Sequence, residues 1–210
     1  MHKPLLLLLG ALIASTPLAS HAAAPTYTMD AAKSTLTFGA DQMGAPFEGH
    51  FGKFSAAIKF DAADLAGSQF DVTVDLASAD TGEEQRNGTL QGPDFFDSAR
   101  FKTAHFVTGA ITKTKTGTYE ATGKLTLRDV TRDVTIAFSF TSRKEGAATV
   151  SYLVGSAALK RHDFGVGRGE YDDTESVGEN VAVKFNLRLL PAAEPGKKQI
   201  PKKPTPSTSQ

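Results

Sequence analysis

Apolar and polar residues alternate one by one along several segments of this chain, and this alternation constrains its fold more than any other feature. It is clearest in QFDVTVDL (69–76), DVTIAFSFT (133–141) and VAVKFNLRL (181–189). Successive side chains of a β-strand point to opposite faces of a sheet, whereas an amphipathic helix repeats every 3.6 residues. The three segments therefore predict antiparallel strands with one face in the core and the other in water.

Less regular alternation predicts further strands. STLTFGA and AAIKFD alternate less cleanly, and strands are also expected near residues 105–112, 119–127 and 149–160. Turn-forming residues separate these segments, for example at 44–46 and 115–117. About eight antiparallel strands can hide their edges by closing into a barrel. We predict a single all-β antiparallel barrel, with a flat sandwich as the alternative. A barrel of this size is filled by side chains or holds one small ligand.

The segment ADTGEEQRNGTLQGPDFFDSARF (79–101) interrupts the alternation. Thr81 is followed by two glutamates, which indicates a helix start, because a hydroxyl can cap the first turn and the helix dipole favours anions there. We expect a short helix from Thr81 to about Leu90. The adjacent Phe95 and Phe96 point in different directions in any regular element, so we expect them to make different contacts.

The two ends of the chain differ in composition from the middle. Residues 1–22 resemble a secretory signal peptide, with Lys3 before a short apolar run and Ala22 before the expected cleavage site. Residues 191–210 are rich in proline, lysine, serine and threonine and are expected to form a disordered tail. Its lysines are compatible with transient contact to an anionic membrane, although a solubilising role is favoured. We therefore expect a domain at 23–190, exported to a bacterial periplasm.

The inventory of reactive residues argues against most enzyme classes. Without the two end segments, 18 basic and 22 acidic side chains remain, and this acidic balance argues against binding to nucleic acid. Cysteine is absent, and His50, His105 and His162 are isolated from one another, which gives a metal site poor material. Neither a nucleophile elbow nor a phosphate-binding loop occurs. We expect no catalytic residue, no metal and no cofactor.

Phenylalanine is abundant, with 14 Phe against no Trp. Apolar pockets with a few placed polar groups are typical of proteins that bind small molecules. Phenylalanines that only fill a core would give the same composition, so both interpretations stay open. In LKRHDFGVG (159–167), Arg161 and Asp163 stand beside a sharp turn. They are interpreted either as an ion pair at a solvated strand end or as part of a polar rim that holds a ligand head group.

Six motifs, in order, resemble the YceI-like family of periplasmic, lipocalin-like proteins that are described as polyisoprenoid-binding. They are DAAKSTLTF (30–38), FEGHFGKFSAAIKFD (47–61), the 79–101 segment, GKLTLRDVTRDVTI (123–136), LKRHDFGVG (159–167) and VGENVAVKFNL (177–187). The resemblance covers about residues 25–190. The chain departs from the family pattern at Asn87, Thr89, Gln91, Gly92 and Asp129, which leaves the head-group preference open.

The resemblance implies a barrel with an apolar tunnel that binds a long isoprenoid chain, such as a polyprenyl lipid or a quinone. It also implies that the 79–101 segment is a helical flap at the barrel mouth. Phenylalanines would face or seal the tunnel, and four charged residues would hold flap and rim together or contact the polar end of the ligand. The candidate ligand-binding residues are Phe38, Phe70, Phe95, Phe96, Phe101, Phe106, Phe138, Phe164, Arg86, Asp94, Arg161 and Asp163.

The leading hypothesis is therefore a periplasmic carrier or store for an isoprenoid lipid or a similar amphiphile. One alternative is an enzyme on lipid or amide substrates that uses Arg161, His162 and Asp163. The other is a stress-linked protein-interaction module with a filled core. An acidic barrel with one open sheet edge is also compatible with a homodimer.

Overall fold

The structure, a computed structural model, describes residues 23–192. The expected signal peptide and all but the first two residues of the expected tail lie outside the described residues. None of the helices within 23–192 is long and apolar enough to cross a membrane.

The described chain is mostly strand, with one short α-helix and several 3-10 turns. The strands are β1 (Thr26–Met29), β2 (Thr35–Gln42), β3 (Ala45–Phe51), β4 (Phe54–Lys59), β5 (Gln69–Asp75), β6 (Ala79–Asp80), β7 (Thr103–Lys113), β8 (Tyr119–Leu127), β9 (Val130–Glu145), β10 (Ala148–Lys160) and β11 (Asn180–Pro191). The helical elements are α1 (Glu84–Gln91), η1 (Ala31–Lys33), η2 (Leu76–Ser78), η3 (Arg161–Phe164) and η4 (Gly169–Tyr171).

Eight of these strands close an antiparallel barrel. They follow the order β1-β4-β5-β7-β8-β9-β10-β11, and β1 pairs with β11 to complete the ring. Every pair in the ring is antiparallel, and most pairs join strands that are consecutive in the sequence. Alternating sequences suit such a sheet, because one face lies in the core and the other in water. The predicted all-β barrel is confirmed, and the sandwich alternative is wrong.

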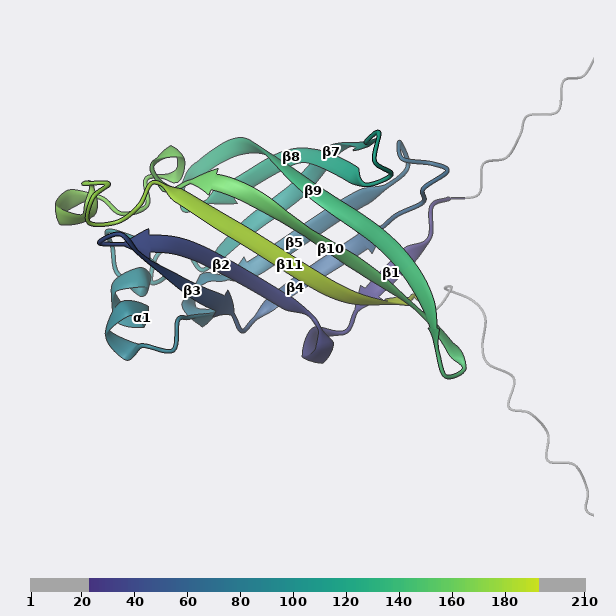
Figure 1. The fold of residues 1–210 in the computed structure, drawn as a ribbon, viewed down its shortest axis with the longest axis horizontal. Helices are drawn as coiled ribbons and strands as arrows, with labels where there is room; N and C mark the ends of the chain where they lie inside the picture. Colours follow the sequence, from purple (N-terminus) through teal and green to yellow (C-terminus); the bar gives the residue numbers. More distant parts are fainter. Residues whose placement is uncertain (1–22, 193–210) are drawn as a thin grey trace, which may run out of the picture.

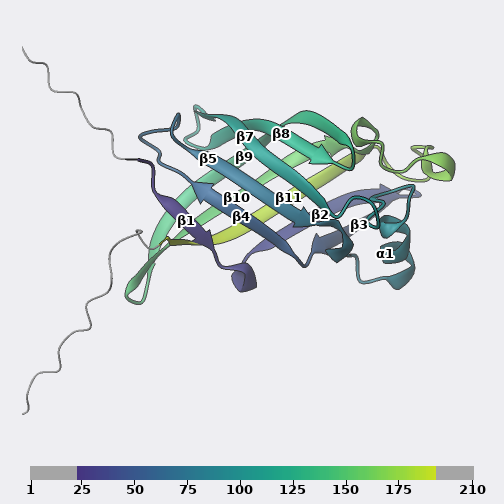
Figure 2. The same ribbon diagram turned by 180° about the vertical axis from the view of Figure 1, so that it is seen from behind.

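The barrel is not built the same way at its two ends. At one end β11 pairs with β1, whereas further along the same edge it pairs with β2, and β2 pairs in turn with β3 and the two-residue β6. Figures 1 and 2 show α1 and the loop between β10 and β11 at this second end, which we call the mouth. The ends of the described chain and the tip of the β9–β10 hairpin lie at the opposite end (Figure 1). The mouth is therefore the end at which α1, the helix of the 79–101 segment, lies.

Aromatic side chains fill the barrel at the end opposite the mouth. Phe60, Tyr119 and Phe138, which we call the aromatic plug, lie with ring centroids 5.1–5.7 Å apart. The ring of Tyr119 stacks on Phe138, and Phe60 meets both rings edge-on. All three are buried. Such edge-to-face and stacked pairs are favoured geometries for aromatic rings, so this end of the barrel is a packed core.

The expected short helix is present but begins later than the sequence indicated. It starts at Glu84, and Glu83 is its N-cap residue without a side-chain capping bond. Thr81 does not cap the helix. Its backbone N–H and its hydroxyl both donate to the side-chain oxygen of Asn87, at 2.8 Å each. Asn87 donates in turn to Asp80 of β6, so Thr81 helps to tie the helix to the sheet.

Candidate functional site

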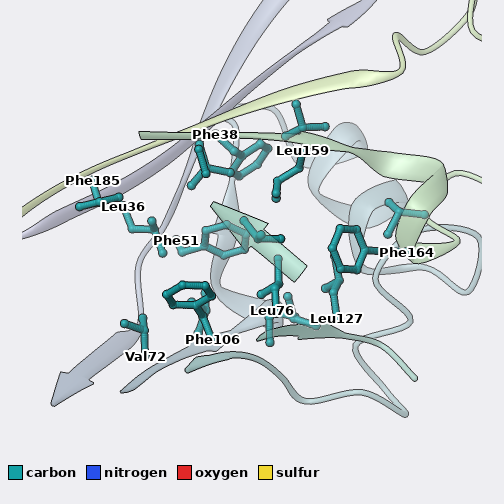
Figure 3. A pocket seen from close by; sticks show the side chains of 18 of the residues that line it. Leu36, Phe38, Phe51, Val72, Leu76, Phe106, Leu127, Leu159, Phe164 and Phe185 are labelled. Atoms are coloured by element: carbon teal, nitrogen blue, oxygen red, sulfur yellow. The ribbon is translucent and has the colours of Figure 1, made fainter. Parts of the chain in front are cut away.

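An apolar cavity of about 220 Å³ occupies the barrel between the aromatic plug and the mouth. Its wall exposes no polar surface. Figure 3 shows side chains from strands on all sides pointing into this space, among them Phe38, Phe51, Phe106 and Phe185. Apart from Lys160, Arg161 and Gly178, every lining residue is Ala, Val, Leu, Ile or Phe. Such a space can hold a hydrocarbon and offers nothing to a polar molecule.

The alternation in the sequence creates this wall directly. The apolar residues of the 69–76 segment all line the cavity, and so do the first two of the 133–141 segment. In the 181–189 segment, Val181, Val183, Phe185 and Leu187 line it, while Leu189 is buried outside the lining. The intervening polar residues face outward; Asp71, for example, pairs with His105 of β7 on the outer surface at 2.8 Å.

Glycines on neighbouring strands let the phenylalanine rings lie flat against the wall. A Cβ atom on Gly49 would collide with the ring of Phe38, and one on Gly155 would collide with the carbonyl of Ala137 and come within 2.5 Å of the ring of Phe185. Because glycine has no side chain, each ring can lie across the adjacent strand instead of standing in the cavity. The open volume thus depends on small residues as well as on large ones.

The structure places most of the candidate phenylalanines at the cavity, and two elsewhere. The cavity lining includes Phe38, Phe70, Phe95, Phe96, Phe106 and Phe164. Phe138 belongs to the aromatic plug, and Phe101 lies beneath the guanidinium groups of Arg100 and Arg128. Neither of these two is part of the lining. Sequence alternation did not separate Phe138 from the lining phenylalanines, because alternation indicates the face of a side chain but not its height along the barrel. Phe101 lies between elements, outside any alternating segment.

The adjacent Phe95 and Phe96 do make different contacts, as expected. Phe95 meets the ring of Tyr171 edge-on, with centroids 5.0 Å apart. Phe96 packs against Phe51 of β3, with centroids 6.0 Å apart. Phe95 therefore joins the 79–101 segment to the β10–β11 loop, and Phe96 joins it to the barrel wall.

Arg161 lies at the mouth end of the cavity and is almost fully buried, with 4% of its surface exposed. Its guanidinium donates to backbone carbonyls rather than to a carboxylate. The acceptors include Gly167 at 2.6 Å, Val166 at 3.1 Å and Val177 at 3.0 Å. Burial lowers the pKa of this guanidinium, and the charges of Glu179, Asp172 and Asp173 oppose that effect. Arg161 thus holds the β10–β11 loop in shape.

The neighbours of Arg161 do not join it in a reactive group. Asp163 is exposed, and His162 points toward Glu179, with Nδ1 2.5 Å from Oε2, and toward Asp172. No hydrogen bond or ion pair links Arg161, His162 and Asp163 to one another in the described part of the chain. Asp94 acts through its backbone carbonyl, which accepts from the N–H groups of Gly167 and Arg168. The ion pair between Arg161 and Asp163 considered from the sequence is absent within residues 23–192.

A second, polar cavity of about 230 Å³, which we call the vestibule, lies under α1 and adjoins the apolar cavity. The two cavities share Phe47, Leu90, Phe95 and Val177 as lining residues. The polar residues of the vestibule are Gln42, Glu83, Gln85, Arg86, Thr89 and Tyr171.

Arg86 is held by three contacts in the vestibule. Its guanidinium pairs with Glu83 at 3.0 Å, donates to the side-chain oxygen of Gln42 at 3.2 Å and lies 4.7 Å above the ring of Phe47. These contacts connect α1 to β2 and β3. At the other side of the vestibule, a hydrogen bond to Glu170 raises the pKa of Tyr171 above its ordinary value.

The described residues contain no group of three or more His, Asp or Glu side chains arranged to hold a metal ion. The chemistry available at the two cavities is apolar contact, hydrogen bonding and a few paired charges.

Comparison with known proteins matches this geometry to one family. A family model described as YceI-like domain covers residues 27–189. This chain belongs to the YceI-like family. The expectation drawn from the six motifs is confirmed, and the match spans the whole barrel.

Relatives and solved structures agree on the fold. A UPF0312 protein of Vibrio vulnificus is 29% identical over 178 residues, which cover 81% of this chain and 94% of the relative. The crystal structure of BcnA from Burkholderia cenocepacia superposes with a TM-score of 0.70 at 38% identity, covering 76% of this chain and 98% of BcnA. A domain from Saccharophagus degradans, described as a polyisoprenoid binding domain, has a TM-score of 0.61 at 17% identity, covering 79% and 98%.

Proposed function

We propose that this YceI-like protein binds the apolar chain of an isoprenoid lipid or quinone, and that it carries or stores this molecule in the bacterial periplasm. The observation that carries the proposal is the cavity with a wholly apolar wall inside the closed barrel. The description of the Saccharophagus degradans domain as polyisoprenoid binding supports the same ligand class. The signal-like residues 1–22 support the location.

The physical argument is that the cavity favours hydrocarbon over water. A buried water needs about two to four polar partners, which this wall does not offer. Dry apolar cavities of about 150 Å³ bind molecules such as benzene, and this one has about 220 Å³. Each CH₂ group removed from water contributes about 0.8 kcal/mol, so a chain of several carbons gains substantial binding free energy. A longer chain would continue toward the vestibule, with its head group at the mouth.

Two neighbouring alanines on β10 give a sharp test of the proposal. Ala157 lines the cavity, whereas the next residue, Ala158, is exposed on the outer face of the barrel. Ala157→Phe would fill part of the cavity, while Ala158→Phe adds the same side chain outside it. We expect the wild type and Ala158→Phe to bind geranylgeraniol, a C20 isoprenoid alcohol, and Ala157→Phe to bind it at least about tenfold more weakly, a loss of about 1.4 kcal/mol.

The measurement is titration of the purified protein without its expected signal peptide, residues 23–210, with the alcohol, in competition with a fluorescent apolar probe. Circular dichroism and thermal unfolding show whether each variant keeps the fold. Absence of binding by the wild type, or equal affinity of the two variants, would rule out this cavity as the binding site.

A further inference from the structure

The vestibule is placed where the polar end of a bound chain would emerge. Because the vestibule and the apolar cavity share Phe47, Leu90, Phe95 and Val177, a molecule whose tail fills one has its head group in the other. Figure 1 shows α1 and the β10–β11 loop on either side of this end of the barrel. The charge state of the vestibule therefore decides which head groups are accepted.

The cation that lines the vestibule, Arg86, is already neutralised. Glu83 pairs with it at 3.0 Å from within the same turn, and Gln42 occupies its Nε–H at 3.2 Å. The face of its guanidinium lies over the ring of Phe47. An anionic head group would have to replace Glu83 or lie beside its carboxylate, and either alternative costs free energy.

Three further cationic residues at this end of the barrel, Arg128, Lys160 and Arg161, are engaged or face away, and a fourth, Arg168, is exposed and lies against Gly165 of the β10–β11 loop. Arg161 is buried and donates to backbone carbonyls, and Arg128 donates to the carbonyls of Pro93 and Phe95. Lys160 is exposed, and the cavity wall that it borders presents no polar surface. These three residues therefore offer no binding site for a phosphate within the described part of the chain.

Carboxylates outnumber cations on both segments that form the mouth. Segment 80–97 has five carboxylates and Arg86 as its cation, and segment 160–179 has six carboxylates against three lysine and arginine residues. Charges at a cleft sum to a local potential that attracts one sign and repels the other. Apart from Glu83 and Arg86, the polar residues of the vestibule carry amides and hydroxyls, on Gln42, Gln85, Thr89 and Tyr171. Some of these groups already bond to neighbours, as the side-chain oxygen of Gln42 does to Arg86 and the hydroxyl of Thr89 to the carbonyl of Gln85.

We propose that the vestibule selects ligands with an uncharged, hydrogen-bonding head group, such as an alcohol, ketone or amide, and rejects the phosphate of an otherwise identical chain. This inference rests on the proposed function, because it assumes that the apolar tail occupies the cavity. Glu83 is the specificity-determining residue, since it neutralises Arg86 and repels an incoming anion.

The test compares two ligands that differ only in the phosphate. Geranylgeraniol and geranylgeranyl phosphate share one C20 chain and are titrated against the same fluorescent apolar probe, below their aggregation concentrations. We expect the alcohol to bind at least about tenfold more tightly in low salt, a difference of about 1.4 kcal/mol. The ratio of affinities falls as sodium chloride rises toward about 1 M, because the Debye length shrinks from about 10 Å at 0.1 M to about 3 Å.

A charge-matched pair of variants locates the effect. Glu83→Gln frees Arg86, so we expect it to strengthen binding of the phosphate several-fold and thereby to lower the ratio of alcohol affinity to phosphate affinity. Glu120→Gln removes the same charge from an exposed site on β8 beside the aromatic plug, and it should leave the affinity ratio unchanged.

Each outcome has a distinct meaning. Equal or tighter binding of the phosphate by the wild type overturns head-group selection while the proposed function stands. An unchanged ratio in Glu83→Gln overturns the role of Glu83. Failure of both ligands to bind overturns the proposed function and this inference with it.

Discussion

Arg161 has a different role in the structure from the roles that the sequence suggested. Next to Asp163 at the end of an apolar strand, it was a candidate for gripping a ligand or forming an ion pair. In the fold its guanidinium instead joins carbonyls from residues 166–178, and 4% of its surface is exposed. A planar guanidinium presents five donors in a fixed fork, which suits several carbonyls around one centre. Its contribution is therefore to the shape of the mouth.

Replacing Arg161 by lysine should cost stability. Lysine keeps the positive charge, but its single ammonium group cannot reach all the carbonyls that the forked guanidinium contacts. Some buried carbonyls therefore lose their hydrogen bonds. We expect Arg161→Lys to lower the free energy of unfolding by about 2–4 kcal/mol, as measured by urea denaturation. Arg132→Lys, at an exposed site with one long hydrogen bond of 3.4 Å, is the control and should change it by less than about 0.5 kcal/mol.

The same variant separates a structural role from a ligand-binding one. If Arg161 acts only by holding the shape of the mouth, any loss of geranylgeraniol affinity in Arg161→Lys should be accompanied by a loss of stability. Unchanged urea stability together with weakened binding would mean that Arg161 acts on the ligand.

Single residues show where sequence reasoning succeeds and where it stops. The different contacts of Phe95 and Phe96 were predictable, because adjacent side chains diverge in any regular element. The partners of Arg161 were not predictable, because they are backbone carbonyls of a loop whose course depends on the folded barrel. Likewise, the alternation placed Phe138 inward, but only the register of β8 and β9 puts it in the plug beside Tyr119.

At the scale of elements, the strands were predictable and their joints were not. The expected strand at 119–127 has those bounds in β8, where residues 119–124 alternate between buried and exposed. The sequence placed the start of the helix three residues too early. Thr81 bonds to the side chain of Asn87 and does not accept from a free N–H of the first helical turn. At the mouth, β2 takes the place of β1 as the partner of β11. This pairing joins residues far apart in the sequence, so no local pattern could predict it.

The tip of the long β9–β10 hairpin is fastened by one carboxylate. Glu145 accepts from the hydroxyl of Tyr152 at 2.5 Å and from Arg188 of β11 at 2.8 Å, and Arg188 also pairs with Asp30 at 2.6 Å. These hydrogen bonds, that of Tyr152 first, lower the pKa of Glu145 from its ordinary value of 4.5 to about 2. The ionised carboxylate is thus favoured in the folded state.

This network should make stability depend on pH in a defined window. Because the folded-state pKa of Glu145 lies below the ordinary one, its stabilisation is complete above about pH 4.5 and is lost as the pH falls to about 2. We expect the wild type to melt above Glu145→Gln at pH 6 and the difference in Tm to disappear near pH 2. Tyr152→Phe removes the hydrogen bond that lowers the pKa of Glu145 most. In a protein that carries Tyr152→Phe, adding Glu145→Gln should therefore lower the Tm at pH 6 by less than it does in the wild type. A gap in Tm that stays constant from pH 6 to pH 2 would contradict this assignment.

On the scale of the whole molecule, the barrel divides into an end that is packed and an end that can receive a ligand. Opposite the mouth, Tyr119 and Phe138 of the aromatic plug and Glu145, Tyr152 and Arg188 of the network lie on β8 to β11, each of which pairs with strands on both sides. At the mouth, β3 pairs with β6 through only His50–Asp80 and Phe51–Ala79. The helix α1 is held by side-chain bonds of Arg86, Asn87 and Gln91 and by one buried side chain, that of Leu90. Stability and binding are thus assigned to different halves of one barrel.

This division predicts how backbone amides exchange with solvent, because local opening costs least where packing and pairing are sparse. In hydrogen–deuterium exchange of the free protein, amides of β8, β9 and β11 near the aromatic plug should exchange slowest, and those of α1 and β3 fastest. Geranylgeraniol should slow exchange in α1, β3 and the β10–β11 loop, which border both cavities, and leave the tip of the β9–β10 hairpin unchanged. The hairpin tip serves as the internal control in the same sample. Protection confined to that tip, or absent from α1 and β3, would contradict the placement of the bound chain beneath α1 at the mouth.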